Sequence, residues 1–355
     1  MRLIEELVNN FKDKELALPI WFENDSLKVL DQRKLPFDEE IHTFTEVEQL
    51  GEAIRSMMIR GSGAIGICGA YGIFLTALKS NGNAQAVKEA GDLLKSTRPT
   101  AVNLMKTVDE MVSVAKGSGE DLISEVEKKA VIILKRQLEF EYKLGEHGAA
   151  LIEDGDTIMT HCHSGAYGGA GYGGRALSVI RTAHEQGKNI HVYTCETRPY
   201  LQGARITALE LKKFGIPHTL ITDNMSGFCM SEGKIDKIVV GSDRVSANGD
   251  LANKVGTYMH ALAAKEHQIP FYTATSSHTI DFNTPSGKSI EVEMRNPSEV
   301  TQFKGMPIAP EGTNALYPSF DITPNHLISG IITEKGVISA PYETNLKKVI
   351  EKVEV

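Results

Sequence analysis

The sequence predicts an α/β protein in which a mainly helical N-terminal domain precedes a doubly wound parallel sheet. Two patterns support this class. Apolar residues before position 150 recur mostly at helical spacing, and short apolar strands alternate with helices after position 154. The length of 355 residues suits two domains. We therefore expect a helical domain with a short β element over residues 1–150 and a sheet domain over residues 151–355.

The N-terminal domain is predicted from amphipathic segments. Leu27 and Val29 alternate with Lys28 within residues 21–31, which indicates a short pair of strands. Residues 61–78 are rich in Gly and Ala but helical in period, so we expect a closely packed core helix there. Other helices are expected from a capping box at Thr45 and Glu48 to Arg60, and over 84–95, 99–115 and 121–152.

The second domain is predicted from a regular alternation of strands and helices. The apolar runs that predict strands are 157–161, 190–194, 219–222, 237–240 and 271–274, followed by a strand-like run at 336–338. Helices are expected near 175–186, 201–214 and 250–267. Open α/β sheets bind ligands beyond the carboxyl ends of their strands. We therefore expect functional residues among the polar side chains that follow the strands: Cys162, Glu196, Asp223 and Asp243.

Composition argues against several classes of partner. The net charge of −8 disfavours a nucleic acid or a membrane surface. The first 15 residues mix acids and bases without an apolar signal core, and we expect no run apolar enough to span a bilayer. The four cysteines (Cys68, Cys162, Cys195 and Cys229) contain no CxxC pair, which fits a reducing, cytoplasmic location.

A phosphate site is suggested by residues 238–256. An apolar strand leads to Asp243, and Asp250 is interpreted as the N-cap of a helix that would place Val255, Met259 and Leu262 on one face. Asn253 and Lys254 would then lie in its first turn, where a cation opposes the helix dipole and an anionic ligand would remove the conflict. The alternative is that Lys254 points into water.

Cys162 follows a strand and could act as an acid, a base or a nucleophile. The alternative is a buried structural thiol. His161 and His163 flank it but would leave the strand on the same face, away from the cysteine, and no other cysteine has ligand spacing. We therefore expect no metal site.

A glycine run at Gly169–Gly174 matches GxGxxG, and Glu196 lies at the distance expected of a dinucleotide fingerprint. The fingerprint should begin directly at the end of a strand, but residues 162–168 intervene. We therefore expect no nicotinamide, and no other cofactor is predicted. Arg60 and Arg98 stand beside glycine or proline turns that suit a phosphate, and Gln202 can bind a sugar hydroxyl. The alternative for Arg60 and Arg98 is that each is an ordinary surface arginine. The alternative for Gln202 is that its segment is only a capping turn.

Taken together, these segments resemble a known family. The chain contains, in this order, RGSGAIG, STRPTAVNL, THCHSGA, ETRPYLQGARITALEL, VVGSDRVSANGDLANKVGTY and FDITPNHLISGIITEKG. The series is similar to the methylthioribose-1-phosphate isomerase family of aldose 1-phosphate isomerases, from about Leu18 onward. The resemblance implies a Rossmann-like catalytic domain after the helical one and a homodimer acting on a sugar phosphate. Regulatory subunits of a translation-initiation exchange factor share the fold.

The resemblance also implies site residues. The catalytic cysteine and aspartate of the family fall on Cys162 and Asp243. Its substrate contacts fall on Arg60, Gly61, Ser62, Arg98, Gln202, Asn253 and Lys254.

The implied reaction converts 5-methylthioribose 1-phosphate to the ribulose 1-phosphate in methionine salvage. The ring oxygen must be protonated as the C1–O bond breaks, and hydrogen must then move from C2 to C1. Asp243, held protonated by an apolar pocket, would be the general acid. Cys162 would either remove the C2 proton or shield a direct hydride shift.

Several positions depart from the family pattern. RGSGAIG replaces RGAPAIG, His163 replaces an asparagine, and Tyr167–Gly174 is unusually rich in glycine. These changes leave the substituent at C5 open, so the alternatives are 5-deoxyribose 1-phosphate, as in 5-deoxyribose salvage, and ribose 1,5-bisphosphate. A non-catalytic regulatory protein of the same fold is disfavoured because Cys162 and Asp243 are both present.

Overall fold

The structure, a computed structural model, describes residues 2–12, 15–99 and 101–351. The chain forms two compact units. Unit 1 comprises Met1–Glu141 and Gly165–Gly174, and unit 2 comprises Tyr142–Ser164 and Arg175–Val355. The boundary therefore falls inside the long helix α6 (Leu122–Ala149).

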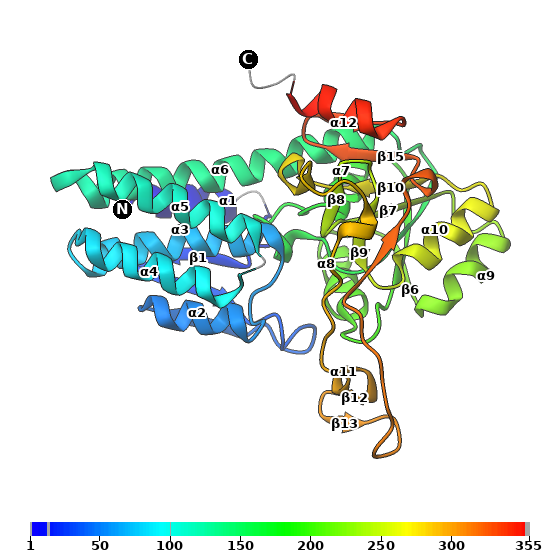
Figure 1. The fold of residues 1–355 in the computed structure, drawn as a ribbon, viewed down its shortest axis with the longest axis horizontal. Helices are drawn as coiled ribbons and strands as arrows, with labels where there is room; N and C mark the ends of the chain where they lie inside the picture. Colours follow the sequence, from blue (N-terminus) through cyan, green and yellow to red (C-terminus); the bar gives the residue numbers. More distant parts are fainter. Residues whose placement is uncertain (1, 13–14, 100, 352–355) are drawn as a thin grey trace. The chain divides into compact units, whose positions relative to one another are not determined.

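Unit 1 combines helices with one small sheet (Figure 1, blue to cyan). Its helices are α1 (Leu3–Lys12), α2 (Val47–Arg55), α3 (Ser62–Lys79), α4 (Ala84–Thr97), α5 (Val102–Gly117) and the first part of α6. Its antiparallel sheet has the order β1 (Ile20–Glu23), β2 (Ser26–Leu30) and β3 (Ile41–Phe44). The buried rings of Phe22 and Phe74 lie 4.9 Å apart between centroids and join the sheet to α3.

Helix α3 is the buried centre of unit 1. A Cβ at Gly72 would lie 2.9 Å from Leu94 of α4, and a Cβ at Gly69 would lie 3.2 Å from Leu104 of α5. Glycine therefore lets both helices approach α3, which confirms the core helix predicted there. Contrary to our expectation, α3 is long and apolar enough to span a bilayer, but 78% of it is buried inside the protein. Because α3 is buried in this way, it can be apolar on all sides without spanning a membrane.

Helix α2 is shorter than predicted. Its capping box is formed by Glu46 and Gln49 rather than by Thr45 and Glu48, and it ends at Arg55 rather than Arg60. Met57 has a φ of 58°, a left-handed conformation that a right-handed helix cannot include.

Unit 2 is built on a seven-stranded sheet of order β16-β15-β10-β7-β4-β5-β6. The strands are β4 (Thr157–Thr160), β5 (His191–Cys195), β6 (His218–Ile221), β7 (Lys237–Val240), β10 (Phe271–Ala274), β15 (Gly330–Thr333) and β16 (Gly336–Ile338). Neighbouring pairs are parallel except β15 and β16. The predicted α/β fold with a parallel sheet is confirmed, and its apolar core includes Met159, Ile238 and Phe271.

The helices of unit 2 are α7 (Ala176–Glu185), α8 (Ala208–Lys213), α9 (Ser226–Ser231), α10 (Thr257–Glu266), α11 (Ser298–Thr301) and α12 (Tyr342–Glu351). The segment predicted as a helix over 201–214 begins as a π-helical stretch, Gly203–Thr207, and continues as α8. A Cβ at Gly203 would lie 1.8 Å from the carbonyl oxygen of Cys195, so only glycine lets this stretch approach the end of β5.

A second sheet of unit 2 has the order β11 (Ile280–Asp281), β8 (Arg244–Ser246), β9 (Leu251–Lys254) and β14 (Phe320–Thr323). A two-stranded hairpin pairs β12 (Gln302–Phe303) with β13 (Met306–Pro307) and projects away from the large sheet (Figure 1, orange).

The prediction of a helix from Asp250 is wrong in its first part. Strand β9 is paired antiparallel on both sides, with β8 and with β14, and α10 begins only at Thr257. Asp250 is not an N-cap; its carboxylate accepts hydrogen bonds from the backbone N–H groups of Gly287 and Asn325, both at 2.9 Å. Of the three residues expected on one helical face, Val255 precedes α10, whereas Met259 and Leu262 lie in it and are each 45% exposed. Pairing across the sheet overrides the local helical pattern.

Candidate active site at the carboxyl edge of the parallel sheet

Cys162 and Asp243 follow two neighbouring strands. Cys162 comes after β4 and Asp243 after β7, and these strands pair in parallel with Met159 opposite Ile238. The chain builds β5 and β6 on one side of β4 and then crosses to β7 on the other. Ligands of open α/β sheets bind where the strand order reverses in this way. The two loops also approach each other, since a Cβ at Gly241 would lie 2.7 Å from that of Ser164.

The backbone of Cys162 is held in a strained conformation. Its φ of 69° is left-handed and is uncommon for a residue with a side chain. Its N–H donates to Thr197 Oγ1 at 2.9 Å, and its carbonyl accepts from Thr207 Oγ1 at 2.8 Å. Residues that keep such strain are held there by their surroundings and often lie at functional sites.

Gln202 contacts the Cys162 thiol. Its Nε2 lies 3.1 Å from Sγ, within the distance of a hydrogen bond to sulfur. The side chain is 2% exposed, and its Oε1 has no hydrogen-bond partner within the described part of the chain. A buried acceptor without a partner is costly, so this oxygen suits a ligand that brings a hydroxyl group beside the thiol.

A hairpin of β8 and β9 connects Asp243 to the strand that carries Asn253 and Lys254. The N–H of Asp243 donates to the carbonyl of Ala252 at 2.9 Å, and β8 pairs with β9 with Arg244 opposite Ala252. Asn253 is buried and donates to Thr257 Oγ1 at 3.0 Å. Lys254 therefore lies at the end of a strand rather than in the first turn of a helix.

The start of α10 is occupied by a carboxylate of the protein itself. Asp321 accepts from the N–H groups of Gly256 at 2.7 Å and Tyr258 at 3.1 Å. Burial outweighs these hydrogen bonds and raises the pKa of Asp321 to about 6. Asp321 therefore uses the backbone donors at the start of this helix. The Lys254 ammonium instead lies 5.0 Å from the ring centroid of Phe320 and 5.6 Å from that of Tyr317.

The remaining predicted substrate contacts belong to unit 1. Gly61 is the N-cap of α3, with a φ of 98°, and a Cβ there would lie 2.3 Å from Gly168. Ser62 Oγ accepts from Asn103 at 2.7 Å. Arg60 precedes this cap, and Arg98 is the C-cap of α4. Glycine at position 61 is thus required by both the backbone conformation and the close contact.

The glycine run that resembles a dinucleotide fingerprint binds a side chain of unit 1. The buried carboxylate of Glu141 accepts from the N–H groups of Ala170, Tyr172, Gly173 and Gly174. Burial raises the pKa of Glu141 in spite of these hydrogen bonds. Backbone donors that could have held a phosphate are used to anchor the loop.

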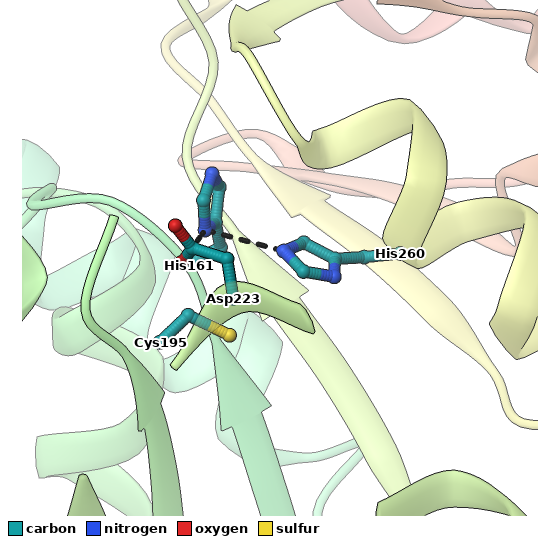
Figure 2. Close-up of side chains that lie close together, drawn as sticks. All are labelled: His161, Cys195, Asp223 and His260. Carbon is teal, nitrogen blue, oxygen red and sulfur yellow. Dashed lines mark hydrogen bonds and ion pairs between the residues drawn. The ribbon is translucent and has the colours of Figure 1, made fainter. Parts of the chain in front are cut away.

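Two clusters of buried side chains near Cys162 were not predicted as clusters, although the sequence singles out His161, His163 and Asp223 individually. His163 Nε2 lies 2.8 Å from Oε1 of Glu210, and both side chains are almost fully buried. His161 belongs to a different cluster with Cys195, Asp223 and His260 (Figure 2). Burial lowers the pKa of both histidines in this cluster and raises that of the Cys195 thiol. The positions of Cys162, Glu196, Asp223 and Asp243 after strands indicated this edge, but their partners come from distant segments and could not be predicted.

Comparison with known proteins identifies the family. A family model described as the initiation factor 2 subunit family matches residues 58–340. The chain belongs to this family. Relatives named methylthioribose-1-phosphate isomerase confirm the resemblance stated from the motifs. The protein from Thermosipho africanus is 48% identical over 92% of this chain and 96% of its own length. The protein from Acetivibrio thermocellus is 46% identical over 93% and 99%.

Two solved structures agree with the fold. The 5-methylthioribose 1-phosphate isomerase of Pyrococcus horikoshii has a TM-score of 0.91 and 36% identity, covering 96% of this chain and 98% of its own. A structure described as translation initiation factor eIF-2B, subunit delta, from A. fulgidus has a TM-score of 0.89 and 39% identity, covering 94% and 100%.

Proposed function

We propose that this chain is an aldose–ketose isomerase that converts 5-methylthioribose 1-phosphate to 5-methylthioribulose 1-phosphate in methionine salvage. Relatives with that name match it at 46–48% identity over most of both chains. The observation that carries the proposal is the placement of Cys162 and Asp243 after two adjacent strands, at the reversal of a sheet that we class as Rossmann-like.

The proposed roles follow from the chemistry of a sugar phosphorylated at C1. Asp243 donates a proton to the ring oxygen as the C1–O bond breaks, because the blocked anomeric carbon cannot open by itself. Hydrogen then moves from C2 to C1. Cys162 either takes the C2 proton and returns one to C1, or shields a hydride that moves directly, and the net change is isomerisation without an external oxidant.

Binding roles are assigned to the surrounding polar groups. Gln202 Oε1 accepts a hydrogen bond from a sugar hydroxyl, and this supplies the partner that the buried oxygen lacks among the described residues. Substrate-binding roles are also proposed for Asn253 and Lys254, and, from the resemblance, for Arg60, Gly61, Ser62 and Arg98. We take the two units as the two domains and infer a cytoplasmic homodimer that needs no cofactor.

Turnover on a panel of sugar phosphates tests the function. Methylthioribose 1-phosphate, 5-deoxyribose 1-phosphate and ribose 1,5-bisphosphate are compared by kcat/KM under one set of conditions. The proposal expects the highest value for the methylthio substrate. Preference for another member would move the assignment to that substrate, and no turnover of any of them would favour a regulatory protein of the same fold.

The route of hydrogen transfer is tested with substrate carrying deuterium at C2. Complete loss of the label to solvent rules out the hydride shift. Full retention at C1 rules out a thiol that exchanges with solvent.

A further inference from the structure

We propose that His161, Cys195, Asp223 and His260 form a binding site for a transition metal ion of the Zn²⁺ class. This site is separate from the groups assigned to catalysis. One ligand atom from each residue lies within 4.8 Å of all the others, and Figure 2 shows the four side chains converging from separate segments. Two imidazoles, a thiolate and a carboxylate are a donor set that Zn²⁺ accepts.

The topology of the sheet produces this cluster. His161 follows the last residue of β4, Cys195 is the last residue of β5, and Asp223 comes shortly after β6. These three strands are parallel neighbours, so their carboxyl ends meet at one edge. His260 completes the set from α10. The four ligands come from four separate segments, so no spacing rule reveals the site in the sequence.

Two distances already match a tetrahedral site. Zinc bonds of about 2.0–2.3 Å place ligand atoms about 3.3–3.8 Å apart. His161 Nδ1 lies 3.3 Å from His260 Nε2 and 3.6 Å from Asp223 Oδ1. The Cys195 sulfur lies within the same 4.8 Å limit, so a small movement brings it to bonding distance.

Outer hydrogen bonds orient the ligand atoms. His161 Nε2 lies 3.0 Å from the carbonyl of Val255, which can only accept, so Nε2 carries the proton and Nδ1 presents its lone pair to the cluster. His260 Nδ1 lies 2.9 Å from Ser226 Oγ. Such contacts from the second nitrogen of a histidine are typical of metal ligands. Asp223 is held in place by the N–H groups of Thr197 and Arg198.

Metal binding moves protons but requires no redox step. Without the ion, His260 carries its proton on Nε2 and donates a hydrogen bond to His161 Nδ1. With the ion, His260 carries its proton on Nδ1 and donates it to Ser226, while Nε2 binds the metal. The Cys195 thiol loses one proton to solvent and binds as thiolate. Four protein ligands close the coordination shell, and three of their side chains are fully buried, so the site holds the ends of β4, β5 and β6 rather than substrate.

Titration of the chelator-treated full chain with Co²⁺ tests the proposal. We expect one ion per chain, absorption of a tetrahedral complex in the visible range and a thiolate-to-metal band in the near ultraviolet. Cys195→Ala should lose the thiolate band, whereas Cys162→Ala should keep it. Ser226→Ala should lower the affinity of the site for Zn²⁺, measured by competition with Co²⁺, about 10- to 100-fold.

Two results would overturn the proposal. A wild-type titration without the thiolate band means that the cluster is only hydrogen-bonded. A band that survives Cys195→Ala but disappears in Cys162→Ala places the ion on the other cysteine. The wild-type measurement decides the matter even where a variant fails to fold.

Discussion

Gln202 Nε2 lies 3.1 Å from Cys162 Sγ, while the second polar atom of the same side chain, Oε1, is buried without a hydrogen-bond partner among the described residues. One amide thus contacts the proposed catalytic thiol and offers a free acceptor beside it. Buried amides are normally hydrogen-bonded at both polar atoms, so the unpartnered oxygen beside the thiol suits a bound hydroxyl group.

Gln202→Leu tests this relationship. The variant keeps the side-chain volume but removes the acceptor, so we expect kcat/KM to fall by about 10- to 100-fold. Leucine also loses the contact of Nε2 with the Cys162 sulfur, but stability should change little, because that contact is a weak hydrogen bond and the buried Oε1 has no partner among the described residues. Gln186→Leu, at an exposed position, is the matched control and should leave the kinetics unchanged. Equal kinetics in both variants would refute the assignment.

Cys162 supplies a test of backbone strain. Cys162→Ala and Cys162→Gly both remove the thiol and should both lose turnover. Only glycine adopts a φ of 69° without a steric cost. The free energy of unfolding of the glycine variant should therefore exceed that of the alanine variant by about 1 kcal/mol. Denaturant unfolding of the pair measures this difference. A less stable glycine variant would show that the loop holds no strain at this residue.

Asp243→Asn tests the general acid. The amide keeps the shape of the side chain but cannot donate the proton that ring opening requires. We expect kcat to fall by about 10²- to 10⁴-fold, while the dissociation constant for substrate changes little. Asp38→Asn, at an exposed position, is the control. Turnover equal to wild type would defeat the proposed role.

Asp321 predicts a specific pH dependence of stability. Its pKa in the folded chain is about 6, above the ordinary 3.8, so the folded state binds more protons between these values. The resulting stabilisation, up to about 3 kcal/mol, is fully present below pH 4 and is lost as the pH rises through 6. Asp321→Asn removes this titration.

The measurement is the free energy of unfolding of wild type and Asp321→Asn between pH 4 and 7. The stability of the wild type relative to the variant should decline as the pH rises. A difference that stays constant across this range would contradict the raised pKa.

The sequence by itself determined the α/β class, the parallel strands β4, β5, β6, β7 and β10, and the positions of Cys162 and Asp243 after two of them, but it did not indicate the parallel strand β15. These depend on local periodicity and on motifs that are contiguous in the chain. Only the tertiary structure decided that residues 251–254 are a strand and that Asp321 caps α10. It alone brought His161, Cys195, Asp223 and His260 together. Sheet pairing and burial join residues that are far apart in sequence, and these contacts override the preferences of any one segment.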